Sequence, residues 1–220
     1  METNLALEKT QIKKPSLFGI IASPTVQFEK MKEKAPIGMP LVLMLLLMTV
    51  TGALGSYVGS NDPILKSADI KIPIAFTVGM GAVGGLFGGA IMFFLTAAFY
   101  RICMVFMGND TPYKKLLVIV IYSSIISSLG MLVNALIALA LGGYEPTYTS
   151  LAPLMANNPT LHAIAQSFDI FKIWYYVVLA LGLHIVAGLS KNKAITLVVI
   201  IFLIGIGFSS LSGFVPQPGM

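Results

Sequence analysis

Two polar side chains lie within long apolar stretches of the chain, and both are of types that can form specific hydrogen bonds or bind a ligand. These are Asn134 and His184. A polar group at membrane depth is costly, so it is a candidate for a functional role. We expect Asn134 to form a hydrogen bond between helices, with a substrate contact as the alternative. We expect a neutral His184 to bond to a neighbouring helix, with binding of a ligand as the alternative.

The other ionisable groups form no recognisable catalytic or metal-binding pattern. The second histidine, His162, falls in a polar stretch apart from His184, so a zinc or bis-histidine haem site would lack ligands on either side. The sequence contains no H-E-x-x-H, G-x-S-x-G or Walker motif. We therefore predict no catalytic, cofactor-binding or metal-binding residues.

The acidic residues lie at the ends of the apolar stretches or outside them. A chain of buried acids for proton or sodium coupling is missing, which disfavours an ion-coupled transporter. Asp169 and Lys172 are three residues apart, so they can pair on one helical face. Trp174 follows them at the start of an interfacial aromatic belt. We interpret this cluster as structural.

The amino-acid composition of the chain indicates a membrane protein. Of 220 residues, 56% are hydrophobic and 10% are charged, against about 25% charged in an ordinary soluble domain. In this class a net charge of +5 is first a topology signal, and no nucleic-acid partner is predicted. The single cysteine, Cys103, excludes an intramolecular disulfide.

Five intervals between charged residues are long enough, or nearly so, for a helix to cross about 30 Å of hydrocarbon. The sequence therefore predicts an all-α integral membrane bundle. Its five transmembrane helices are expected at 37–58, 72–100, 116–141, 170–189 and 194–212. The uncharged stretch 146–168 contains Pro153 and Pro159, so we expect a polar loop there, with a short surface helix near 161–168.

The basic residues predict the orientation of this bundle. With the N-terminus in the cytoplasm, all lysines and arginines except Lys66, Lys71 and Lys172 lie on the cytoplasmic side. Residues 1–36 then form a cytoplasmic segment, 37–212 the membrane domain and 213–220 a short external tail. No removable signal peptide is predicted, because the first span begins late and lacks a cleavage site.

The cytoplasmic segment contains a predicted surface helix that begins at Ser23 and Pro24. Phe28 and Met31 are three residues apart among charged neighbours, as in a helix at the lipid headgroups. We interpret it as a juxtamembrane anchor, with a docking site for a cytoplasmic partner as the alternative. In the docking case, changing Phe28 and Met31 to alanine would weaken partner binding.

The second predicted span is rich in glycine, and small residues let helices approach closely in lipid. Its overlapping G-x-x-x-G pairs comprise Gly81, Gly84, Gly85, Gly88 and Gly89. We expect these residues to pack within the bundle. The alternatives are a homodimer, a contact with another membrane protein or a kinked helix that lines a path.

Two short motifs, by their order and spacing relative to the spans, resemble the Yip family of multi-pass membrane proteins. Their residues are Ser23, Pro24 and Phe28 before the first span, and Asp169, Phe171 and Trp174 at the start of the fourth. The resemblance covers nearly the whole chain. In particular the chain is similar to bacterial members found beside an adaptor-type protein and an ABC exporter.

The resemblance implies a non-enzymatic accessory or assembly protein of the bacterial cell membrane. Its implied partners are the permease and adaptor subunits of an ABC exporter. Membrane lipid is expected from the composition, a homo-oligomer is an alternative from the glycine-rich helix, and no cofactor is expected. The implied role is resistance to a toxic peptide. Two alternatives stay open: a small transporter or permease acting on its own, and an intramembrane enzyme.

Overall fold

A computed structural model describes residues 14–67 and 72–212 of the chain. The predicted segments 1–36 and 213–220 thus lie partly or wholly outside the described residues. Every regular element in the described part is helical, which confirms the predicted fold class there. The helices are α1 (Gly19–Ala22), α2 (Pro24–Glu33), α3 (Gly38–Gly59), α4 (Pro63–Ser67), α5 (Ile74–Phe106), α6 (Tyr113–Leu141), η1 (Ala152–Met155), α7 (Pro159–Ala165), α8 (Ile170–Ile185) and α9 (Lys191–Ser212).

Four of these helices are each long and apolar enough to cross a membrane: α3, α5, α6 and α9. The fifth predicted span has a different form. Helix α8 has 16 residues, or about 24 Å, which is shorter than the hydrocarbon core. It qualifies only together with α7, from which it is bent by 43°.

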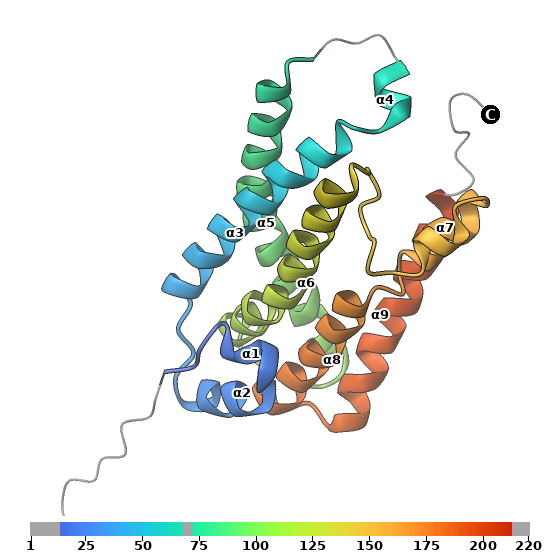
Figure 1. Ribbon diagram of the computed structural model, residues 1–220. Coiled ribbons are helices and arrows are strands. Elements are labelled where there is room, and N and C mark those ends of the chain that lie inside the picture. Colours follow the sequence, from blue (N-terminus) through green and yellow to red (C-terminus); the bar gives the residue numbers. More distant parts are fainter. Residues whose placement is uncertain (1–13, 68–71, 213–220) are drawn as a thin grey trace, which may run out of the picture.

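Helix α8 ends at Ile185, whereas the sequence predicts a span that continues to 189. Gly188 adopts a φ of 71°, a left-handed conformation that favours glycine. Beyond it, the backbone N–H of Leu189 donates to the carbonyl of Leu183 at 3.1 Å. This turn reverses the chain, and α9 starts at Lys191 and runs back along α8 (Figure 1).

Helix α5 continues through Arg101 to Phe106, beyond the predicted end at residue 100. The Arg101 guanidinium donates to the carbonyl of Thr111 at 2.9 Å and lies 3.4 Å from the Asp110 carboxylate. A charged side chain with such partners at the end of the bundle does not require the helix to stop.

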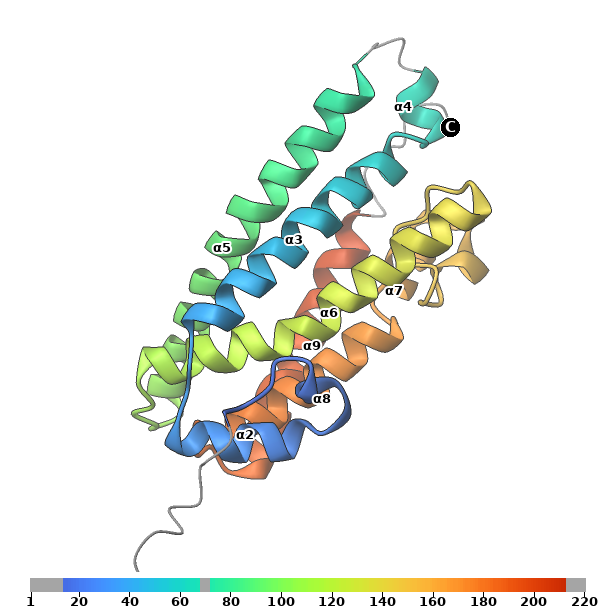
Figure 2. The same cartoon turned by 60° about the vertical axis from the view of Figure 1, so that its left-hand side comes forward.

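Helix α6 forms the centre of the bundle. Of its apolar segment 72% is buried inside the protein, against 17% for each of α3, α5 and α9. The α3–α5 hairpin lies along one side of α6, and the α8–α9 hairpin lies on the other side (Figures 1 and 2). The bundle thus has two helical hairpins that share one core helix.

Helix α2 closes one end of this bundle by packing against α8. Phe28 and Met31 are both fully buried in the core of the chain itself. The expectation that these two side chains face the headgroups or a docked partner is therefore wrong. The charged side of α2 is the exposed one, where Glu29 and Lys32 form an ion pair at 2.7 Å.

Candidate functional site

One glycine face of α5 packs directly on α3. A β-carbon built on Gly81 would lie 2.5 Å from the carbonyl oxygen of Gly52, and one on Gly85 would overlap the backbone carbonyl of Met48. A β-carbon on Gly89 would lie 3.2 Å from the Met48 side chain. These three glycines, four residues apart, therefore allow the backbones of α3 and α5 to approach closely.

A second glycine face of α5 has no neighbour in the part of the chain that the structure describes. No atom lies within 4 Å of a β-carbon placed on Gly84 or Gly88. Met80 and Ile91 are on the same face by helical spacing, and they are 55% and 57% exposed. We call Met80, Gly84, Gly88 and Ile91 the open α5 face. It is flat and apolar, as in surfaces where another membrane helix packs.

Asn134 belongs to a buried network at the opposite end of the bundle from α2. Its Nδ2 donates to the Gly130 carbonyl at 2.9 Å and to Thr149 Oγ1 at 2.8 Å, and its Oδ1 accepts from the Thr149 backbone N–H at 2.8 Å. The Thr149 hydroxyl in turn donates to Asp169. The expected bond between helices is thus replaced by a bond to the loop, which links α6 to the start of α8.

Asp169 is the N-cap of α8. Its Oδ1 accepts from the backbone N–H of Lys172 at 2.9 Å, which satisfies a donor that the first helical turn leaves free. The Lys172 ammonium donates to the Ser167 hydroxyl at 3.5 Å and forms no ion pair within 4.0 Å of the Asp169 carboxylate. The predicted side-chain pair of Asp169 and Lys172 is therefore not formed, because the carboxylate caps the helix and binds Thr149 instead.

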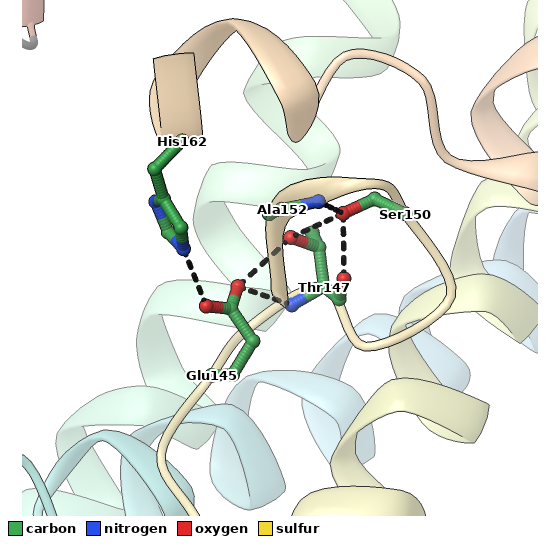
Figure 3. A network of polar contacts seen from close by, with 5 residues as sticks. All are labelled: Glu145, Thr147, Ser150, Ala152 and His162. Atoms are coloured by element: carbon green, nitrogen blue, oxygen red, sulfur yellow. Dashed lines mark hydrogen bonds and ion pairs between the residues drawn. The ribbon is translucent and has the colours of Figure 1, made fainter. Parts of the chain in front are cut away.

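A second polar network orders the loop between α6 and α7 (Figure 3). The Glu145 carboxylate accepts from the backbone N–H and the hydroxyl of Thr147, at 3.1 and 3.0 Å. Its other oxygen lies 2.7 Å from His162 Nε2 on α7. The Ser150 hydroxyl donates to the Thr147 carbonyl and accepts from the Ala152 N–H. His162 therefore binds α7 to the loop.

His184 lies at the other end of α8, far along the chain from His162. Its Nδ1 is 2.7 Å from the carbonyl oxygen of Leu189, in the turn that follows its own helix. The expected bond to a neighbouring helix is thus replaced by a local bond that stabilises the α8–α9 turn. The described residues contain no group of three or more His, Cys, Asp or Glu side chains that could hold a metal ion.

Comparison with known proteins identifies the family of this chain. The Yip1 domain matches residues 18–212, which includes every helix described above. The chain belongs to the Yip1-domain family. It is 35% identical over 226 residues to the membrane protein YknW of Bacillus subtilis strain 168, covering 98% of this chain and 97% of the relative. No solved structure matches the chain. The family that the two motifs indicate is thereby confirmed.

The phenylalanines of both motifs, Phe28 and Phe171, pack over glycines in this Yip1-domain protein. A β-carbon on Gly182 of α8 would lie 2.9 Å from the ring of Phe28, and one on Gly130 of α6 would lie 2.6 Å from Phe171 Cβ. Phe28 thus inserts where α2 meets α8, and Phe171 inserts where α8 meets α6. The two rings hold α8 at both of its ends.

The remaining motif residues start helices or face outward. Ser23 and Pro24 are the N-cap and first residue of α2, although the Ser23 hydroxyl makes no capping bond. Trp174 is 37% exposed on α8. Two of these residues thus begin a helix, and the third lies on the surface of α8.

Several residues of these sites are missed by sequence reasoning. Thr149 and Glu145 organise the two networks, yet in the sequence they are ordinary polar residues of a loop. Gly130 and Gly182 receive the motif rings, but they belong to no G-x-x-x-G pair that would single them out. Their only signal is a glycine within an otherwise bulky helix, which indicates a close approach.

Proposed function

We propose that this Yip1-domain protein is a non-enzymatic accessory subunit of an ABC exporter in the bacterial cell membrane, acting in resistance to a toxic peptide. The observation that carries the proposal is the open α5 face, which offers a flat apolar surface to a helix of another subunit. Similarity over almost the full length to a bacterial membrane protein supports the location in a bacterial membrane.

The distribution of charge supports a cytoplasmic N-terminus and an external C-terminus. Most described basic residues gather at the end of the bundle where α2 lies and where α6 and α9 begin: Lys30, Lys32, Lys34, Arg101, Lys114, Lys115, Lys191 and Lys193. Only Lys66 and Lys172 among the described basic residues lie toward the other end. Basic residues are retained on the cytoplasmic side of a membrane, so α2 faces the cytoplasm in this proposal.

The test is affinity purification of the tagged protein from its native cells in a mild detergent, followed by quantitative mass spectrometry. We expect exporter permease and adaptor subunits in stoichiometric amounts. In a Gly84→Leu, Gly88→Leu variant the recovery should fall at least about tenfold, because leucine side chains fill the flat face. Gly79→Leu is the matched control: it is also open but lies about 140° around the helix from Gly84.

Two results would overturn the proposal. One is recovery of the protein without exporter subunits while the purified protein moves a solute across reconstituted vesicles, which would make it a transporter. The other is equal recovery of exporter subunits with the double variant and with the control, which would exclude the open α5 face as the contact.

A further inference from the structure

A cavity of about 470 Å³ lies between α8 and α9. Its walls are apolar: Val177 and Leu181 line it from α8, and Ile195 and Val199 line it from α9. Three of these side chains in the membrane domain, Val177, Ile195 and Val199, are between 43% and 47% exposed. The two helices therefore leave between them a space that apolar material must fill in a bilayer.

The dimensions of the cavity fit a single hydrocarbon chain. The lining of α8 runs from Ile173 to His184, which at 1.5 Å per residue is about 16 Å, close to the roughly 15 Å of one leaflet.

One end of the cavity is polar and basic. Lys191 and His184 line it there. His184 Nδ1–H donates to the Leu189 carbonyl, which leaves Nε2 as an acceptor for a headgroup hydroxyl. The Lys191 side chain is exposed, and its ammonium forms no hydrogen bond or ion pair within the described part of the chain. By contrast, the nearby Lys193 ammonium donates to the Met107 carbonyl at 3.1 Å.

We propose that this cavity is a binding site for one anionic phospholipid. An acyl chain lies between α8 and α9, the phosphate lies at the basic end against the Lys191 ammonium, and His184 Nε2 accepts from a headgroup hydroxyl. The chain length of one leaflet places a headgroup at that end, and the charge of Lys191 selects an anionic headgroup over a zwitterionic one. The site is separate from the open α5 face, so it does not depend on the proposed exporter contact.

The test is native mass spectrometry of the delipidated full-length protein, with equal amounts of phosphatidylglycerol and phosphatidylcholine that carry identical acyl chains. We expect one phosphatidylglycerol bound in preference. Lys191→Gln should lower the ratio of phosphatidylglycerol to phosphatidylcholine about fivefold, the effect of one basic residue at an anionic surface. Lys114→Gln removes the same charge at the same end of the bundle but outside the cavity, and it should leave the ratio unchanged.

A second variant tests the apolar part of the site without changing charge. Ala180 lines the cavity, so Ala180→Phe should exclude the acyl chain and reduce binding of both lipids at least tenfold. Ala140→Phe, on an exposed part of α6, is its control, and gel filtration with circular dichroism verifies that each variant is folded. Equal lipid ratios in Lys191→Gln and wild type, or unchanged lipid binding in Ala180→Phe, would overturn the proposal.

Discussion

The two hairpins on either side of α6 pack in opposite ways. In the α3–α5 hairpin, Gly52, Gly81 and Gly85 bring the two backbones into direct contact. In the α8–α9 hairpin, side chains such as Val177 and Val199 line a cavity between the two helices. Helices in lipid gain little from burying apolar surface, so backbone contact and filled space decide how tightly they associate.

This difference indicates that the two hairpins have separate roles. The α3–α5 hairpin packs through one glycine face, and its second glycine face, around Gly84 and Gly88, is the one we propose for a contact with another protein. In the α8–α9 hairpin we propose that lipid fills the cavity, while Phe171 packs α8 against α6 and Phe28 packs α2 against α8. Variants should therefore affect the two hairpins differently.

The largest effect is expected from Gly85→Leu. The first side-chain carbon would overlap the Met48 carbonyl, and a backbone atom cannot move aside as a flexible side chain can. We expect α3 and α5 to separate, at a cost of about 3 kcal/mol in the free energy of unfolding in detergent. Gly84→Leu, one residue away on the open face, should change it by less than about 0.5 kcal/mol. Similar losses of unfolding free energy in both variants would show that α3 does not pack on one glycine face of α5 in preference to the other.

A smaller loss is expected from Asn134→Ala, on the side of α6 that holds α8. The substitution leaves the backbone N–H of Thr149 without its partner, at a cost of about 2 kcal/mol. Hydrogen exchange should accelerate in the loop around Thr149 and at the start of α8, and it should be unchanged in α3 and α5. Ser127→Ala is the control, because the Ser127 hydroxyl bonds only to its own helix, at Ser124. Uniform acceleration across the bundle would contradict a local tether.

The smallest effect is expected where Phe28 packs over Gly182. In Gly182→Ala the new methyl group meets the ring edge of Phe28 and the Cγ2 methyl of Ile119, so the ring must shift. A double-mutant cycle of Gly182→Ala with Phe28→Leu should therefore give a coupling energy of about 1 kcal/mol in unfolding experiments. A coupling energy near zero would mean that the ring does not fill the space over Gly182.

The helices of the bundle could be predicted from charge spacing because a membrane helix must satisfy its own backbone within about 20 apolar residues. That rule gives α3, α6 and α9 within about three residues of their ends, but it ends α5 too early, at 100 instead of Phe106. It gives the wrong end for α8, since Gly188 breaks the helix inside an uncharged interval. It also does not reveal that Phe28 and Met31 turn inward, because charged neighbours surround any helix at the membrane surface.

The polar contacts could not be predicted, because their partners lie in irregular backbone. Asn134 binds Thr149 in the loop after α6, and His184 binds a carbonyl in a turn. Neither partner has a periodic signal in the sequence. The glycine pairs of α5 likewise predict close packing on two faces, but the sequence does not distinguish the face that α3 occupies from the open one.

The central claim is that the open α5 face, and not the α8–α9 hairpin, contacts the exporter. The most direct test is photo-crosslinking in intact cells with benzoylphenylalanine in place of Ile91 on that face or of Leu203, an exposed residue of α9. We predict a crosslink from position 91 to an exporter permease subunit and none from position 203. Crosslinks of equal yield from both positions, or none from position 91, would contradict it.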